Sequence, residues 1–201
     1  MKRIIALMTA VVVAAVSSAF SSPNAAAEET QHDNVLIAYF LRSGENYNVG
    51  VVERGNTDLL AEIIADETGG KLFRIETVKK YPVAYDEMLA VATEERTNKE
   101  RPELKTTIDD FESYDVVFVG YPIWWGDMPM AMYNFLESYD WSDKTVIPFN
   151  THEGSGQANT VNTIKGICEG AEVMSGFYKN TILHITSISS KTSNHFVKIV
   201  T

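Results

Sequence analysis

Short apolar runs alternate with amphipathic stretches along most of the chain. Residues 35–40 are almost wholly apolar, which is typical of a strand covered on both faces of a sheet. Residues 115–121 are predicted as the central buried strand, and residues 144–151 as a further strand. Residues 71–78 alternate between apolar and polar side chains, which predicts a strand nearer the sheet edge, and residues 171–178 continue the series. The pattern therefore predicts five strands in a largely buried sheet.

Stretches with helical periodicity lie between these strands. The first predicted helix begins at Asn56 or Thr57, either of which is placed to cap it, and it stops at Gly69-Gly70. Further helices are predicted over residues 84–98, 128–139 and 157–168.

The alternation of strands and helices determines the expected fold class. Strands joined by helices at this spacing run parallel, and their crossovers are right-handed, so helices cover both faces of the sheet. We expect an α/β fold, a doubly wound three-layer sandwich around a five-stranded parallel sheet. The tail after Tyr178 is rich in β-branched residues and serine, and the pattern does not place a final helix there.

Residues 1–27 have the layout of a secretory signal peptide. Lys2 and Arg3 precede an apolar run, and Ala25-Ala26-Ala27 matches an A-x-A cleavage site. The run is shorter than the roughly 20 residues of a membrane-spanning helix, so cleavage is favoured over the alternative of a retained anchor. We expect export to the periplasm or the medium without a membrane span, with residues 28–33 as a linker and 34–201 as the domain.

Charge and cysteine content narrow the classes of partner and chemistry. Asp and Glu outnumber Lys and Arg by 27 to 17, which argues against nucleic acid and anionic membranes and is compatible with a cationic protein partner or with solubility alone. Cys168 is the only cysteine, so neither an intramolecular disulfide nor a thiolate metal cluster is possible. The four histidines lack metal-ligand spacing, and no metal is expected.

Ligands of a doubly wound sheet bind beyond the carboxyl ends of its strands. After the first strand, Arg42-Ser43-Gly44 and Gly55-Asn56-Thr57 flank an insertion at residues 45–54. Hydroxyl groups and free N–H groups before a helix form an anion site, although a simple helix cap is the alternative. The segment lacks the Gly-Lys-Ser/Thr of a nucleotide-hydrolysing P-loop.

The other two strand exits are also unusual. Pro122-Ile123-Trp124-Trp125-Gly126 places two indoles in a loop, either as core or interface anchors or to stack on a flat aromatic ligand. Thr151-His152-Glu153-Gly154-Ser155-Gly156 is a polar loop in which His152 and Glu153 form an acid–base pair or simply lie at the surface. Ser155 lacks the G-x-S-x-G spacing of an esterase.

Taken in order, these three loops resemble those of flavodoxins over about residues 34 to 178, with Gly120-x-Pro122-Ile123-Trp124-x-Gly126 as the most specific part. The resemblance implies a flavodoxin-like fold and an FMN site. It implies a phosphate site at Arg42 to Gly44 and Gly55 to Thr57, a stacking indole at Trp124 backed by Trp125, and a pyrimidine edge at residues 151–156.

The function implied by the resemblance is electron transfer through FMN. The chain would act as a carrier for a redox partner protein or as a reductase of quinone-like acceptors, with His152 as the proton donor of the enzyme. The alternative is a flavin-free module that binds another planar ligand or a protein in the same cleft. The sequence does not predict the oligomeric state.

Overall fold

The computed structural model describes residues 34–48 and 50–180. Its strands are β1 (Val35–Phe40), β2 (Gly44–Asn46), β3 (Gly50–Val52), β4 (Lys71–Ile75), β5 (Val116–Pro122), β6 (Thr145–His152), β7 (Glu172–Val173) and β8 (Phe177–Asn180). Its helices are α1 (Asn56–Thr68), α2 (Tyr85–Asn98), the short 3-10 helix η1 (Phe111–Ser113), α3 (Met130–Glu137) and α4 (Thr160–Ile167). The predictions for residues 1–27, 28–33 and 181–201 lie outside the described residues.

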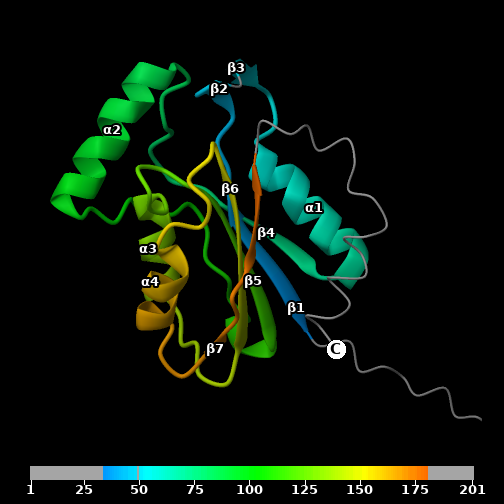
Figure 1. The fold of residues 1–201 in the computed structure, drawn as a ribbon. Coiled ribbons are helices and arrows are strands. Elements are labelled where there is room, and N and C mark those ends of the chain that lie inside the picture. The colour runs from blue at the N-terminus through cyan, green and yellow to red at the C-terminus, as the bar shows by residue number, and fades with distance from the viewer. Residues whose placement is uncertain (1–33, 49, 181–201) are drawn as a thin grey trace, which may run out of the picture. The chain divides into compact units, whose positions relative to one another are not determined.

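The main sheet has the order β4-β1-β5-β6-β7, with β8 also paired to β6 (Figure 1). Every pair in it is parallel, which confirms the predicted doubly wound sheet. The strand predicted over residues 171–178 is divided in two, because β7 pairs with the start of β6 and β8 with its end. Gly176 interrupts the strand with a φ of 67°. Among the described residues, the sheet therefore has six strands at five positions.

Alternate residues of β1 face two separate cores. Leu36, Ala38 and Phe40 pack with α3 and α4, whereas Val35, Ile37 and Tyr39 pack with Leu60, Ala61 and Ile64 of α1. Figure 1 shows α1 on one side of the sheet and α3 and α4 on the other. This two-residue period explains why the strand reads as a continuous apolar run.

Some predicted boundaries were wrong. β4 ends at Ile75 rather than at residue 78, and α3 is shorter than predicted because Pro129 occupies its N-cap. β6 ends one residue later than predicted, at His152, which pairs with Asn180 of β8. Thr151 pairs with both Pro122 of β5 and Lys179 of β8. The first two residues of the predicted third loop therefore belong to a strand.

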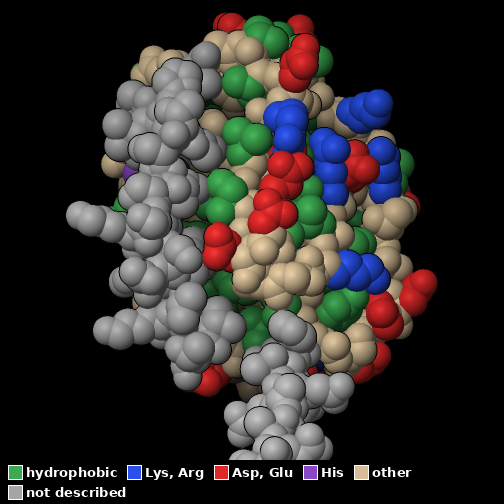
Figure 2. Space-filling model, turned by 90° about the vertical axis from the view of Figure 1, so that its right-hand side faces the viewer, with side chains coloured by type: hydrophobic (Ala, Val, Ile, Leu, Met, Phe, Trp, Pro, Cys, Tyr) green, Lys and Arg blue, Asp and Glu red, His purple; other side chains and the backbone are tan. Residues whose placement is uncertain are grey.

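The edge strand β4 carries charged side chains. Lys71 and Arg74 are exposed, and charges on an edge strand oppose pairing with another sheet. On the face shown in Figure 2, Lys and Arg side chains gather in the upper part among acidic ones, and hydrophobic side chains are scattered. None of the helices in the described residues has the length and hydropathy needed to cross a bilayer.

Candidate functional site

A cavity of about 320 Å³ lies beyond the carboxyl ends of β1, β5 and β6. The structure brings most of the predicted site residues to it. Those that line it are Arg42, Gly55, Asn56, Thr57, Pro122, Ile123, Trp124, Trp125, Gly126, Thr151, His152, Glu153 and Ser155. Ser43, Gly44, Gly154 and Gly156 are not part of the lining.

The insertion at residues 45–54 does not separate the two segments of the loop that it interrupts. It folds as an antiparallel hairpin, β2 and β3, in which Gly44 pairs with Val52. The residues on either side of the insertion lie in close contact: a Cβ atom added to Gly55 would lie 2.7 Å from the carbonyl oxygen of Arg42. The chain after β1 and the start of α1 thus form one continuous wall of the cavity.

Arg42 fastens this hairpin in place. Its Nη1 donates to the carbonyl oxygen of Pro82 at 2.8 Å, and its Nη2 donates to those of Glu45 and Val83 at 2.8 and 3.0 Å. The side chain is buried, and burial lowers the pKa of Arg42. Since three of its N–H groups bind backbone oxygens, only Nε has no partner within the described residues. Of the five N–H groups of the guanidinium, the Nε–H and one N–H of Nη1 therefore remain for the predicted contact of Arg42 with an anion.

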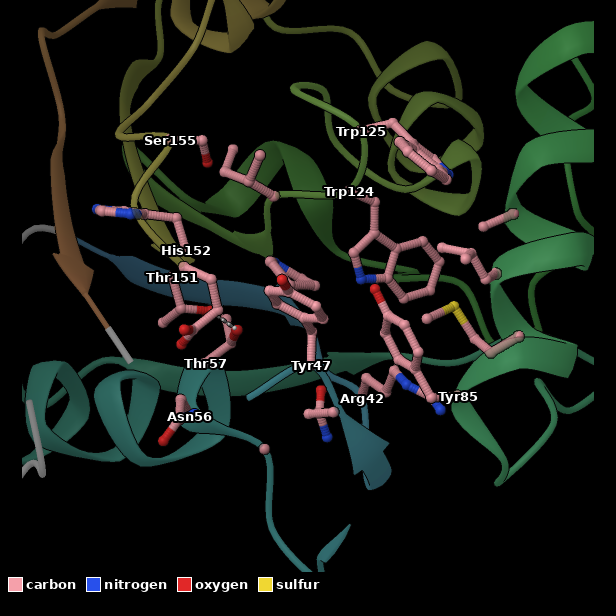
Figure 3. A pocket seen from close by; sticks show the side chains of 18 of the residues that line it. Arg42, Tyr47, Asn56, Thr57, Tyr85, Trp124, Trp125, Thr151, His152 and Ser155 are labelled. Atoms are coloured by element: carbon pink, nitrogen blue, oxygen red, sulfur yellow. Dashed lines mark hydrogen bonds between the residues drawn. The ribbon is translucent and has the colours of Figure 1, made fainter. Parts of the chain in front are cut away.

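The first turn of α1 faces the cavity without a side-chain cap. Its N-cap is Gly55, so the prediction that Asn56 or Thr57 caps the helix was wrong. The Oγ1 atom of Thr57 instead lies 2.9 Å from that of Thr151, the dashed contact in Figure 3. Both threonines are buried. One hydroxyl hydrogen of the pair and the uncapped N–H groups of the helix remain for an anion.

A two-residue turn, Trp125-Gly126, follows directly on Trp124. Trp124 N–H donates to the Asp127 carbonyl and Asp127 N–H donates back, at 2.8 and 2.9 Å. Trp125 and Gly126 take φ angles of 54° and 71°, the left-handed values that such a turn requires. The turn separates the two indoles, so that Trp124 is half-buried and Trp125 is 52% exposed.

Trp124 is held in one orientation by two other rings. Its ring centroid lies 5.5 Å from that of Phe40 and 5.3 Å from that of Tyr81, with interplanar angles of 90° and 80°. Such edge-to-face pairs are favourable in addition to simple burial. Trp124 is therefore a fixed wall of the cavity, whereas Trp125 lies at its rim.

His152 is oriented away from the cavity. Its Nδ1 accepts the Gly154 N–H at 2.9 Å, and its ring centroid lies 5.1 Å from that of Tyr178 on β8. Figure 3 shows the imidazole directed away from Tyr47 and Trp124. Burial lowers the pKa of His152, because the charged imidazolium is poorly solvated there. The orientation favours a structural role for His152 over the predicted proton transfer.

Glu153 differs from its neighbour. Both carboxylate oxygens are buried, and neither has a hydrogen-bond partner in the described part of the chain. Burial raises the pKa of Glu153, because the charged form is poorly solvated there.

No group of His, Cys, Asp and Glu side chains in the described residues has the arrangement of a metal site.

One wall of the cavity was not predicted as part of the site. It consists of residues from the hairpin and from α2, namely Asn46, Tyr47, Tyr85, Met88, Leu89 and Ala92. The rings of Tyr47 and Tyr85 are 5.9 Å apart, and Figure 3 shows both directed into the cavity with Trp124. Residues 85, 88, 89 and 92 follow helical spacing, but the same spacing is typical of a core-facing helix.

Comparison with known proteins agrees with this geometry. The flavodoxin family model matches residues 34–195, and no curated protein gives a match. Solved structures of proteins described as flavoproteins, from Bacteroides eggerthii and Bacteroides uniformis, are each 26% identical to the chain, with TM-scores of 0.67 and 0.66. The matches cover 84% and 83% of this chain and 98% of each of theirs.

A third solved structure is more distant. It is a flavoprotein from Lactobacillus acidophilus in complex with FMN, 21% identical, with a TM-score of 0.56 over 73% of this chain and 92% of that one. The resemblance inferred from the three loops is confirmed by the family match: the chain belongs to the flavodoxin family.

Proposed function

We propose that the chain binds FMN in this cavity and transfers electrons through it. The observation that carries the proposal is the uncapped start of α1, which faces the same cavity as the oriented indole of Trp124. A helix N-terminus favours a phosphate group, and an aromatic wall favours a flat ring. The FMN bound by the Lactobacillus acidophilus flavoprotein supports the choice among flat phosphate-bearing ligands.

The residues present fit both ends of FMN. The first-turn N–H groups of α1 and the free hydroxyl hydrogen of the Thr57–Thr151 pair would bind the phosphate. Trp124, Tyr47 and Tyr85 would surround the ring system. The cavity volume lies within the range of about 300–1,000 Å³ that is typical of ligand sites.

In this proposal the cofactor supplies reversible uptake and release of electrons, and the protein supplies binding and shielding. Tyr47, 56% exposed, and Trp125 lie at the mouth of the cavity and would limit the access of water to the ring. The carboxyl of Glu153 lines the same cavity and is the better candidate than His152 for holding a proton there.

We further propose that the acceptor is either a small quinone-like molecule or a cationic redox protein. The exposed rings of Tyr47 and Trp125 would contact a flat acceptor, and the net charge of −10 would attract a basic protein. Export through the N-terminal segment is also part of the proposal. Mass spectrometry of the chain recovered from the producing cells and their medium tests it, because a chain that begins at Met1 would contradict cleavage.

Titration of the purified chain with FMN tests the central proposal. We expect quenched flavin fluorescence and submicromolar affinity. Trp124→Leu keeps an apolar side chain but removes the ring, and it should weaken binding at least about tenfold, whereas the control Leu72→Ala on the edge strand should not. If the folded chain takes up no FMN, the proposal fails and the flavin-free binding module becomes the better explanation.

A further inference from the structure

A second pocket, of about 360 Å³, shares Arg42 and Trp124 with the cavity. It lies at the carboxyl ends of β1 and β4, and its lining includes Ser43, the predicted loop residue that the main cavity leaves out. This position, beyond the strand ends of a doubly wound sheet, is the one in which ligands of such folds bind. The FMN binding and electron transfer proposed above do not involve this pocket.

The pocket is basic although the protein is acidic. Arg74 from β4, Lys80 from the following loop and Lys105 from a separate segment all line it. The one carboxylate in its lining, that of Glu76, lies 3.5 Å from the Nζ of Lys105. Arg74 and Lys80 make no ion pair with any described residue. With Arg42, four cations and one carboxylate give a local charge of +3, against −10 for the chain.

Arg42 adds a buried positive charge to this pocket. The residue is only 6% exposed, and its Nε makes no hydrogen bond in the described residues. Arg42 forms no close ion pair there, although the carboxylate of Glu45 is near enough to interact with it electrostatically. A buried cation whose charge is only partly compensated is costly, and an anion in the pocket would offset that cost. The cations Arg74, Lys80 and Lys105 and the buried Arg42 therefore all favour a negatively charged ligand.

The apolar part of the lining is aromatic. Phe40, Tyr81 and Trp124 form a cluster in which each pair of rings is close to perpendicular, with centroids 5.3 to 5.7 Å apart. The Tyr81 hydroxyl donates to Glu95 Oε2 at 2.7 Å, which fixes that ring. A rigid aromatic surface beside a set of cations suits a ligand with an apolar body and an anionic group.

We propose that this second pocket binds a small organic anion, a carboxylate or a phosphate ester on a ring-sized apolar body, while FMN occupies the main cavity. Because Trp124 lines both the main cavity and the second pocket, a ligand in the second pocket would change the environment of the indole that faces FMN. The site is distinct from the cofactor site, and the proposal does not depend on the identity of the electron acceptor.

Nuclear magnetic resonance of the ¹⁵N-labelled full chain, with and without FMN, tests the proposal. The indole N–H signal of Trp124 is assigned by its loss in Trp124→Phe, and the chain is titrated with benzoate, phenyl phosphate and the neutral analogue benzamide. We expect saturable shifts with one or both anions in the presence of FMN, and none with benzamide. Saturation by either anion supports the site and identifies the preferred anionic group.

Charge-neutral variants locate the binding. Arg74→Gln and Lys80→Gln should each weaken anion binding at least about tenfold, since each removes a charged hydrogen-bond donor. Arg96→Gln, an equal change of charge on α2 outside the pocket, should have no effect. Equal weakening in Arg96→Gln, equal binding of benzamide, or displacement of FMN by the anions would each overturn the proposal.

Discussion

The contact between Thr57 and Thr151 allows stability and cofactor binding to be separated. The two residues are 94 positions apart in sequence, 2% and 3% exposed, and joined by a single contact of 2.9 Å between hydroxyl oxygens. Replacing either by Val preserves its shape and leaves the other hydroxyl buried without this partner. An unsatisfied buried polar group costs about 1–3 kcal/mol, so each single variant should lose that much free energy of unfolding.

The double variant should behave differently. When both hydroxyls are replaced by methyl groups no unpaired group remains, and the loss of stability should fall below about 1 kcal/mol. With about 2 kcal/mol for each single variant and less than about 1 kcal/mol for the double variant, the coupling energy between the two positions is about 3 kcal/mol, which exceeds the usual error of a double-mutant cycle. Affinity for FMN should not recover, because the hydroxyl hydrogen that the phosphate would accept is gone. A loss of at least about tenfold is expected in the double variant.

Urea unfolding of the four proteins measures the first effect, and fluorescence titration with FMN measures the second. Thr93→Val, on the exposed side of α2, is the control for a threonine that does not line the cavity. Additive losses of stability would refute the assigned hydrogen bond. Wild-type FMN affinity in the double variant would refute a phosphate site at this pair.

Three further predictions concern packing, charge and the hairpin. Gly120→Ala should cost about 3 kcal/mol in urea unfolding, because a Cβ there would lie 2.1 Å from the ring of Phe149; an unchanged midpoint would contradict this packing. Burial raises the pKa of Glu153, so the folded state favours the protonated carboxyl and loses stability as rising pH ionises it. Glu153→Gln keeps an uncharged side chain at every pH, and its melting temperature should therefore exceed that of the wild type at pH 8 but not at pH 4. Glu169→Gln, at an exposed position, is the control and should show no such pH-dependent difference. Arg42→Met should lower the free energy of unfolding in urea by about 3 kcal/mol, since three carbonyl oxygens lose a charged donor. An unchanged free energy of unfolding together with weakened FMN binding would instead indicate that Arg42 contacts the phosphate directly.

The sequence predicted the strands and helices well where their signals are local. β1 is apolar at every position and α1 ends at Gly69, so both are readable without any knowledge of their neighbours. The ends of strands are less local. β6 extends one residue past its predicted end, to His152, where it pairs with Asn180 of β8, and His152 itself carries no signal that indicates this.

The site was predictable as far as it consists of strand exits. The carboxyl ends of parallel strands share one edge of the sheet, so the loops after β1, β5 and β6 had to converge. The contribution of α2 was hidden, because helical spacing shows which face is apolar but not whether that face packs on a core or lines a cavity. The direction of the His152 ring depends on contacts with Gly154 and with Tyr178 in a different strand.

Local patterns of residues were enough to predict the fold class, the three loops and the position of the tryptophan pair in one of them, because periodicity, turn residues and loop chemistry act over a few neighbouring residues. The contacts between distant segments, in contrast, are set by the folded chain. It closed the insertion by bringing Gly55 against Arg42, and it paired Thr57 with Thr151. It also gathered cations from three separate segments around one pocket. Such contacts depend on the packing of the whole sheet, and packing between distant segments leaves no local pattern in the sequence.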